Sequence, residues 1–319
     1  MRSLYLLLTL SILSLFASFT VAEDGKLKFS FGLIGDLPYF KSEEGALQTL
    51  IEQMNSENLA FVVHDGDIKN GHEFCTDDLF LKRKKMFEAS RAPFIYVPGD
   101  NEWTDCHRSD NGNYDPIERL NKLRELFWAD DYSLGQTKLK LEQQSSNPKY
   151  SDYRENSRWI YGDVLFVGLN IPGSNNNYGR NDLMDQEFYQ RSNANSAWLS
   201  ESFQLAKSKN LAGVMVIIQA NPNFNHGMIR RNRDGYRDFR ELLLQEVVAF
   251  KKPVVLVHGD THQFRIDQPL YEGKTLEIVK NFTRLETFGS PFINWVKVTV
   301  DPNDPKLFQI QIGNRLEND

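Results

Sequence analysis

The residues best suited to chemistry are four Gly-Asp pairs, each of which closely follows an apolar, strand-like run. The pairs are Gly35-Asp36, Gly66-Asp67, Gly99-Asp100 and Gly259-Asp260. Composition alone predicts about one or two such pairs in the whole chain. Because the carboxyl ends of the strands in an open α/β sheet share one edge, where ligands bind, we expect the four aspartates to converge. The alternative is that Gly-Asp is simply good turn chemistry, which is how we interpret a fifth pair at 162–163.

Four carboxylates that lie close together need positive charge beside them. Like charges oppose one another's ionisation, and a bound metal ion is the usual compensation. Other ligand-type side chains accompany the pairs: His262 and Asn101 stand beside two of them, and Gln219 and Asn221 end another apolar run. Such an oxygen-rich set with few histidines suits Mg²⁺, Mn²⁺ or Ca²⁺ better than a histidine-dominated Zn²⁺ site.

The elements that must position these residues alternate between strand and helix patterns, which predicts an α/β architecture. We expect strands at 28–34, 59–64, 94–97, 163–169, 214–219 and 253–257, and helices at 44–55, 77–89, 117–127, 185–207 and 236–250. From 275 onward the pattern is all strand, at 276–279, 295–300 and 307–311, while 128–158 is the least periodic region. No linker or repeat divides the chain, so we predict one domain over 23–319.

Composition and targeting signals limit the possible partners and location. The chain of 319 residues has 37 basic and 43 acidic side chains, a formal charge of −6, which argues against nucleic acid or a membrane surface as the main partner. Residues 4–21 are apolar between Arg2 and Ala22, the layout of a secretory signal peptide over 1–22, with an uncleaved membrane anchor as the alternative. We therefore expect a secreted or extracytoplasmic protein, with no membrane contact after cleavage.

The same location bears on the two cysteines and on a possible glycan. In an oxidising compartment Cys75 and Cys106 are expected to form a disulfide, and two independent buried thiols are the alternative. Asn281 opens an Asn-Phe-Thr sequon, which would accept a glycan in a host that glycosylates secreted proteins.

The order of these motifs resembles that of the calcineurin-like metallophosphoesterase superfamily over about 28–311. The family carries Asp-x-His, Gly-Asp-x-x-(Asp or Tyr), Gly-Asn-His-(Glu or Asp), a strand-end His and Gly-His-x-His. Its first aspartate matches Asp36, its metal-bridging aspartate matches Asp67, and its final histidine matches His262. The resemblance implies a two-sheet β-sandwich core flanked by helices, and two divalent cations that hold a hydroxide for in-line attack on a phosphoester.

The chain departs from the family at several ligand positions. The family's histidines fall on Pro38, Asn101 and Asp260, its third-motif asparagine falls on Asp100, and its strand-end histidine has only Gln219 or Asn221 nearby. The resemblance thus implies one metal position made by Asp36, Asp67 and His262, and another made by Asp67, Asp100, Asp260 and Asn221 or Gln219. We favour Mn, Mg or Ca, with Zn or Fe as alternatives. Asn70 stands where purple acid phosphatases have a tyrosine that ligates ferric iron, so a coloured iron centre is not implied.

The proton donor and the phosphate-binding residues are less clearly marked. The family's proton-donating histidine is replaced by Asn101, so we consider His107 and His226 as acids, with exposed loop histidines as the alternative. Arg265, Lys69 and Arg108 are candidates to bind substrate phosphate. The stretch 171–178 is expected to be a solvated turn, or else part of the cleft. The competing function is a binding protein that keeps the fold but has lost catalysis.

Overall fold

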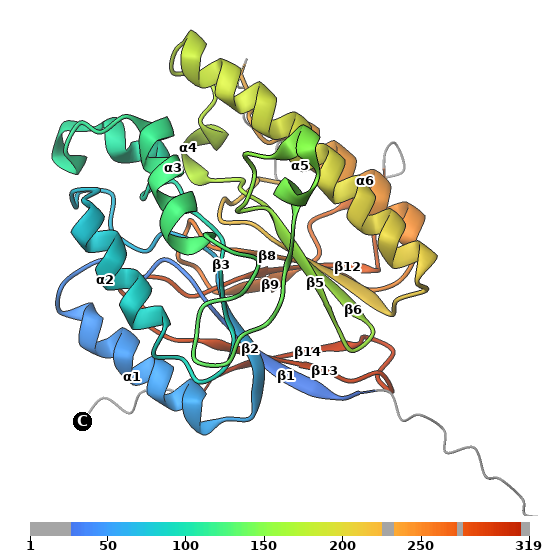
Figure 1. The fold of residues 1–319 in the computed structure, drawn as a ribbon. Helices are drawn as coiled ribbons and strands as arrows, with labels where there is room; N and C mark the ends of the chain where they lie inside the picture. The colour runs from blue at the N-terminus through green and yellow to red at the C-terminus, as the bar shows by residue number, and fades with distance from the viewer. Residues whose placement is uncertain (1–26, 225–232, 273–276, 314–319) are drawn as a thin grey trace, which may run out of the picture.

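The computed structural model describes residues 27–224, 233–272 and 277–313 (Figure 1). The predicted signal peptide, 1–22, lies outside these ranges. Two β-sheets pack against each other, and helices cover their outer faces, α1 to α3 on one side and α5 and α6 on the other (Figure 1). The architecture is therefore the predicted α/β fold, a two-sheet core between two helical layers.

The first sheet has the strand order β14-β13-β1-β2-β3. Its parallel part is β1 (Phe29–Ile34), β2 (Leu59–His64) and β3 (Phe94–Tyr96), and the antiparallel strands β13 (Val296–Val300) and β14 (Phe308–Ile312) extend it beyond β1. The helices that cover its outer face are α1 (Glu43–Ser56), α2 (Asp77–Phe87) and α3 (Pro116–Phe127). Each parallel strand thus ends at the same edge, where the Gly-Asp pairs follow.

The second sheet has the order β4-β5-β6-β7-β8-β12-β9. Its central strands are parallel: β6 (Val164–Gly168), β7 (Gly213–Ile217), β8 (Val254–His258) and β12 (Phe282–Glu286). The antiparallel outer strands are β4 (Glu142–Gln143), β5 (Ser157–Tyr161) and β9 (Arg265–Asp267). The long helices α5 (Asp182–Ser208) and α6 (Arg237–Phe250) pack on its outer face.

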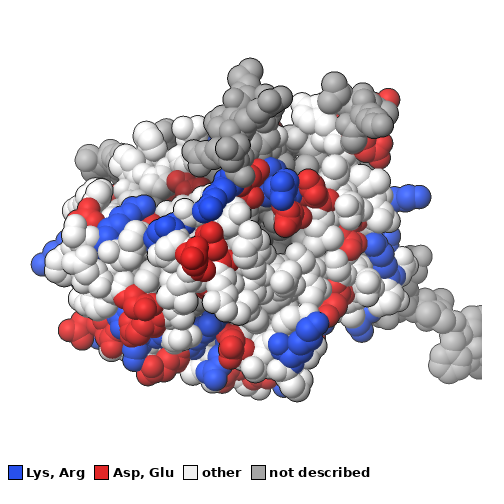
Figure 2. All heavy atoms as spheres, turned by 90° about the horizontal axis from the view of Figure 1, so that it is seen from above, with Lys and Arg blue, Asp and Glu red and all other residues white. Residues whose placement is uncertain are grey.

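Short elements occupy the loops around this core. They are 3-10 turns η1 (Thr104–His107), η2 (Ser109–Asn111), η3 (Gln144–Ser146) and η4 (Pro148–Tyr150), the single turn α4 (Gly173–Asn176), and the hairpin of β10 (Tyr271–Glu272) and β11 (Glu277–Ile278). No helix in the described ranges is both long and apolar enough to cross a bilayer. Basic and acidic side chains are mixed over the face that Figure 2 shows, without a continuous basic surface.

Side chains alternate between the two faces of each strand. The strands therefore contribute to two cores, one between the sheets and one under the helices. In β2, Phe61 and Val63 face the other sheet, whereas Val62 packs under the helices. Aromatic rings fill the space between the sheets: Phe61 stacks on Phe31 at 4.8 Å, and Phe166 of β6 meets Phe61 edge-on at 4.9 Å. Because side chains on both faces of these strands are buried, the strands read as nearly continuous apolar runs in the sequence.

Four strands of the second sheet, β4, β5, β9 and β12, were not predicted, and β12 and β5 are the longest of them. β12 lies between β8 and β9, yet its sequence contains Arg284, which is buried and pairs with Asp267 of β9. This buried charge interrupts the apolar pattern by which strands are recognised. β5 lies in the region 128–158 that lacked periodicity, and its outer partner β4 is only two residues long. In both cases pairing across the sheet, rather than local pattern, makes the strand.

The predicted disulfide is confirmed: Cys75 and Cys106 are joined, with Cα atoms 5.8 Å apart. Both side chains are fully buried, and they connect the loop after β2 to the η1 turn after β3. These are the loops that carry Asp67 and Asp100. The disulfide therefore fixes one half of the candidate site.

Replacing both Cys75 and Cys106 by alanine is expected to lower the free energy of unfolding by about 3 kcal/mol, because the unfolded chain regains the freedom of a loop of 31 residues. Urea denaturation of wild type and variant measures the difference. Equal midpoints, with no free thiol in the denatured wild-type protein, would contradict this expectation.

His64, at the end of β2, is a buried neutral histidine that links two loops. Its Nε2–H donates to the Leu37 carbonyl (2.9 Å), and its Nδ1 accepts from the Gly66 amide (3.2 Å). Burial lowers the pKa of His64 from 6.5 to about 4. The neutral ring thus joins the loop after β1 to the loop after β2.

The pKa of His64 predicts a pH-dependent contribution to stability. Between pH 6.5 and pH 4 the unfolded chain binds the proton more readily, so stability falls as the pH is lowered through this window, by up to about 3 kcal/mol. In His64→Gln this contribution is absent, so the stability advantage of wild type shrinks over the same window. Chemical denaturation at several pH values tests this, and parallel pH profiles of the two proteins would rule it out.

Candidate functional site

The four aspartates of the strand-end pairs lie together between the two sheets' loops. Asp36, Asp67 and Asp100 follow β1, β2 and β3, and Asp260 follows β8 of the other sheet. The Asp260 amide donates to both carboxylate oxygens of Asp36 (3.1 and 3.0 Å), and the Asn101 amide donates to Asp67 Oδ1 (3.1 Å). The convergence expected from the sheet edge is therefore present in the structure.

The backbone at these residues is held in an unusual conformation. Asp36, Asp67, Asp260 and His262 have φ values of 50°, 57°, 76° and 58°, in the left-handed region that non-glycine residues seldom adopt. Each such residue costs roughly 1–3 kcal/mol, and such costs cluster at functional sites. The surrounding structure thus supports a side-chain arrangement that folding by itself does not favour.

Glycine is needed before the aspartates because the chains approach closely there. A Cβ on Gly99 would lie 2.1 Å from Asp67 Oδ1, and a Cβ on Gly259 would lie 2.1 Å from Asp36 Oδ2. Each glycine therefore makes room for the carboxylate of another motif. This explains the Gly-Asp pattern better than turn chemistry does, whereas the exposed pair at 162–163 fits the turn interpretation.

Tyr39, which the sequence did not single out, places its hydroxyl at the centre of the first group of ligand-type atoms. Its Oη lies 2.9 Å from Asp67 Oδ2, 3.1 Å from His262 Nε2 and 3.4 Å from Asp36 Oδ1. The side-chain amide of Asn101 donates to both Tyr39 Oη (3.2 Å) and Asp67 Oδ2 (2.9 Å). Asp36, Asp67 and His262 are thus brought together as the motif resemblance implied, with a phenol among them.

Asp100 belongs to a second group of ligand-type side chains. Ser174 Oγ lies 2.8 Å from Asp100 Oδ2 and 2.8 Å from Asp105 Oδ1, and Arg108 pairs with Asp105 at 2.7 Å. Asp260 Oδ2 accepts from the Asn221 backbone amide at 2.9 Å. This half of the site therefore contains oxygen atoms from both sheets and a basic residue at its rim.

The electrostatics of the site show a shortage of positive charge. Burial raises the pKa of Asp36, Asp67 and Asp100 well above the usual range, and repulsion from neighbouring carboxylates raises it further. Among the described residues, no lysine or arginine forms an ion pair with these three or with Asp260, and the nearest basic atom is His262 Nε2, 3.6 Å from Asp36 Oδ1. Charged carboxylates so buried require a cation.

The types of side chain in the site suit a cation, but their present positions do not form a metal-binding group. In the described ranges no group of three or more His, Cys, Asp or Glu side chains is arranged to hold a metal ion. The carboxylates are instead held by the hydrogen bonds given above. Buried carboxylate oxygens, an imidazole and amide oxygens are nevertheless the ligands that hard divalent cations take. The site is therefore a candidate cation site whose ligand-type side chains are in hydrogen-bonded positions.

Gln219 and Asn221, the candidates to replace the strand-end histidine, are less available as ligands. Gln219 is fully buried, and its Oε1 accepts from the Gly173 amide at 2.6 Å. Asn221 Oδ1 accepts from the Asn223 amide at 3.0 Å, so Asn221 reaches Asp260 through its backbone. Both residues support the loops around the second group.

Three basic residues were candidates to bind substrate phosphate. Of these, only Arg108 is partly exposed and also close to the acidic residues of the second group. All three donors of Lys69, which is fully buried, are used by the carbonyls of Asn70 and Asn101 and by Asn111, each at 2.8 Å. Arg265 donates to Glu286 through two nitrogens, at 3.1 and 2.6 Å. Arg108 lies 3.4 Å from Ser174 Oγ. Lys69 and Arg265 thus have structural partners in place of a substrate.

The predicted proton donors are distributed differently. His226 lies outside the described residues. His107 is exposed, and its Nδ1–H donates to the Thr104 carbonyl in its own η1 turn (2.8 Å). Asn101 lies fully in the site, but its neutral amide orients Asp67 and Tyr39 and has no acidic proton to give. The described residues therefore supply no histidine in the family's acid position.

Asn281, the sequon residue, uses its side-chain amide inside the fold. Its Nδ2 donates to the carbonyls of Val247 and Lys252, each at 3.0 Å. Val247 lies in the last turn of α6 and Lys252 follows the helix, so the amide ties the carboxyl end of α6 to the segment that leads into β8. Glycosylation of Asn281 remains a prediction, and a glycan there would replace at least one of these hydrogen bonds.

The stretch 171–178, expected to be a solvated turn, is largely buried and forms the wall of the second group. Ser174, Asn175, Asn176 and Asn177 all have positive φ, from 48° to 62°, a left-handed turn that costs roughly 1–2 kcal/mol per residue. The buried Arg191 of α5 holds the turn through the carbonyls of Asn170 and Asn176. The run of three asparagines was the available signal, because asparagine tolerates this conformation.

Arg180, just after this turn, forms no ion pair with any residue that the structure describes. Its Nη1 is buried and has no hydrogen-bond partner among the described residues. Burial lowers its pKa, and the acids that oppose this most strongly are Asp105 and Asp100 of the second group. Sequence analysis missed Arg180 because no motif marks it. Only the turn from β6 brings it to the site.

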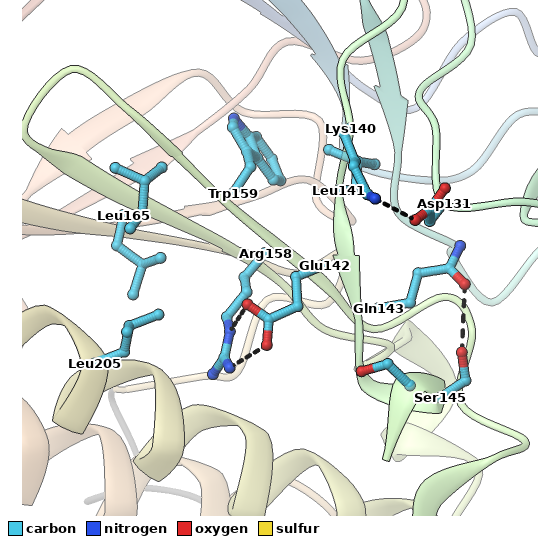
Figure 3. A pocket seen from close by; sticks show the side chains of 12 residues that line it. Asp131, Lys140, Leu141, Glu142, Gln143, Ser145, Arg158, Trp159, Leu165 and Leu205 are labelled. Carbon is cyan, nitrogen blue, oxygen red and sulfur yellow. Dashed lines mark hydrogen bonds and ion pairs between the residues drawn. The ribbon is translucent and has the colours of Figure 1, made fainter. Parts of the chain in front are cut away.

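A separate hollow of about 590 Å³ lies at the edge of the second sheet (Figure 3). It is lined by residues of β4 and β5, where Arg158 pairs with Glu142, and by Leu165 and Leu205 (Figure 3). None of the clustered aspartates lines it. Its charged groups are already paired, so the chemistry of the molecule lies elsewhere, at the ends of β1, β2, β3 and β8.

Comparison with known proteins gives the family of the chain and solved structures that it resembles. The chain is similar to a solved dimetal phosphatase from Danio rerio, with 12% identity and a TM-score of 0.53 over 90% of this chain and 99% of that one. A purple acid phosphatase from yellow lupin (Lupinus luteus) seeds has 13% identity and a TM-score of 0.49 over 86% and 49%. No curated protein sequence matches. The family model of the calcineurin-like phosphoesterases matches residues 29–264, most of the chain, and the chain therefore belongs to that family.

Proposed function

We propose that this protein is a secreted, metal-dependent phosphoester hydrolase with two divalent cations in its site. The observation that supports this most directly is the set of four aspartates from both sheets, three of them buried and Asp260 partly buried, for which the described residues provide no lysine or arginine partner. Family membership adds the class of reaction. The signal-like segment at 1–22 is the basis for proposing secretion.

In this proposal the two groups described above are the two cation positions. Asp36, Asp67 and His262 hold one cation, and Asp67, Asp100 and Asp260 hold the other, with Asp67 shared. When bound, the cations polarise the phosphoester and activate a water molecule for in-line attack. Mn²⁺, Mg²⁺ or Ca²⁺ are the metals that this oxygen-rich set favours, and Zn²⁺ or iron are the alternatives.

The residues of the chain have distinct tasks around these positions. Asn101 orients Asp67 through two contacts, from its backbone N–H and its side-chain amide. Ser174, in the left-handed turn, holds Asp100 in place. Arg108 and Arg180 stand at the rim of the second group and are proposed to bind the non-bridging oxygens of the phosphate. His226 remains the proposed acid for the leaving group.

A second candidate function is a binding protein that keeps the fold without catalysis. The observations that favour it are the replacement of the family's histidines at Pro38, Asn101 and Asp260, and the hydrogen-bonded state of the carboxylates. Such a protein would bind a phosphoester or an anionic ligand at the same rim without cleaving it. The two functions differ in metal content and turnover, which can be measured together.

Asp67→Asn is expected to remove both metal and activity, because Asp67 is the residue shared by the two positions. Hydrolysis of p-nitrophenyl phosphate and bis-p-nitrophenyl phosphate should fall at least about 1,000-fold, as measured with added Mn²⁺ or Mg²⁺. Metal content, from elemental analysis of protein purified without chelator, should fall from close to two ions per chain.

The matched control for this variant is Asp163→Asn. Asp163 also follows a glycine, but it is exposed and lies outside the site, so its replacement should leave metal content and turnover unchanged. Equal activity in wild type and Asp67→Asn would count against the hydrolase. A wild-type protein that stays free of metal after addition of Mn²⁺ and shows no turnover would support the binding protein instead.

Arg180→Ala is expected to lower kcat/KM by about 10- to 100-fold, since a charge-assisted hydrogen bond to phosphate is worth about 1.5–3 kcal/mol. Inorganic phosphate should inhibit the variant less strongly than wild type. Arg154→Ala, which removes an exposed arginine away from the site, is the control. An unchanged KM and phosphate inhibition in Arg180→Ala would show that Arg180 does not contact the substrate.

A further inference from the structure

We infer that Tyr39 is a direct ligand of the cation position made by Asp36, Asp67 and His262. The inference rests on the proposed function only in requiring that this position bind a metal. No family motif assigns a role to Tyr39, which lies three residues after Asp36. Its hydroxyl nevertheless contacts all three of the predicted ligands.

Three ligand-type atoms face the Tyr39 hydroxyl, which has one proton. His262 Nδ1 lies 2.6 Å from the Ser290 carbonyl, which can only accept, so Nδ1 carries a proton and Nε2 is the ring nitrogen that faces Tyr39 Oη. Two carboxylate oxygens, from Asp36 and Asp67, face the same hydroxyl. A phenol has one proton to give, so the hydroxyl donates to only one of these atoms. Asp67 Oδ2 also accepts from the Asn101 side-chain amide, and Asp36 Oδ1 also accepts from the Asp260 backbone amide.

A metal ion in place of that single proton would be shared by all three of these atoms and by the phenol oxygen. The Asn101 amide approaches Oη from a further direction at 3.2 Å, so the oxygen already accepts a hydrogen bond, as a ligand oxygen often does. With the phenol oxygen included, the position has four ligand atoms instead of three. This extends the set of acid and histidine side chains, which by themselves do not form a metal-binding group.

The spacing of the atoms agrees with shared coordination. Ligands bound at about 2.0–2.2 Å from one ion lie roughly 3.0 Å apart at adjacent octahedral positions and roughly 3.4 Å apart in a tetrahedron. Tyr39 Oη lies 2.9, 3.1 and 3.4 Å from its three neighbours, and His262 Nε2 lies 3.6 Å from Asp36 Oδ1. These separations span the values expected for the edges of one coordination shell.

Tyr39 is also held in place, as a ligand should be. Its backbone N–H donates to Glu43 Oε2 at 2.7 Å, its carbonyl accepts from the Asn70 side chain, and its ring meets that of His262 edge-on at 5.0 Å. Asn70 therefore supports the loop of Tyr39 and contributes no ligand of its own. The hydroxyl is fixed by contacts that a phenylalanine would mostly retain.

Tyr39→Phe tests the inference, because it removes one oxygen and keeps the ring. We expect the affinity for Mn²⁺, measured by titration calorimetry, to fall at least about 10-fold. Ferric iron serves as a second probe: a phenolate bound to it gives a visible charge-transfer absorption, which wild type loaded with Fe³⁺ should show and the variant should lack. Tyr161→Phe, a half-buried tyrosine packed on Phe29, is the matched control and should keep both properties.

Two results would overturn the inference about Tyr39. If the hydroxyl instead fills the cation position, Tyr39→Phe will bind Mn²⁺ as tightly as wild type or more tightly, which overturns the inference. Iron bound to wild type, as shown by elemental analysis, without the visible absorption also overturns it. Metal binding and absorption as expected, but no phosphoester hydrolysis, would refute the proposed function and leave Tyr39 as a ligand.

Discussion

Repulsion among buried carboxylates is the constraint on which the rest of this structure depends. Asp36, Asp67, Asp100 and Asp260 come from four strand ends on two sheets, and burial disfavours the charge on each of them. A fold gains nothing in stability from such a cluster, since replacing buried charges by apolar groups is often stabilising. The cluster is therefore best explained by the cation chemistry of the calcineurin-like phosphoesterase family to which the chain belongs.

Much of the surrounding structure serves to hold this unfavourable arrangement. Glu102, fully buried, accepts from the backbone amides of Asp67, Ile68 and Gly99 and from the Tyr96 hydroxyl, so it fixes the turns after β2 and β3. The disulfide joins the same two loops, and neutral His64 joins the loops after β1 and β2. Left-handed backbone at the aspartates is the conformational cost that these contacts offset.

Prediction from the sequence succeeded best where the local residue pattern of an element matches its role in the tertiary structure. Apolar runs buried on both faces gave β1, β2, β6, β7 and β8, and the Gly-Asp pairs marked the carboxyl ends that meet. It failed where a buried charge interrupts a strand, as at Arg284 in β12, or where a neighbouring strand alone defines the element, as in β5. It also misread the turn at 174–177, because asparagine serves both solvated turns and left-handed buried ones.

What the sequence by itself determined is the α/β class, the disulfide partners and the identity of the four converging aspartates, because periodicity, cysteine number and strand ends are local features. The two-sheet arrangement was implied by the family resemblance. The tertiary structure alone decided which polar residues are free to act. Lys69 and Arg265 are occupied by protein acceptors, whereas Arg180 has no ion-pair partner in the described part of the chain and Tyr39 stands among the ligand-type atoms. Such availability depends on contacts between residues far apart in the chain, which no local pattern records.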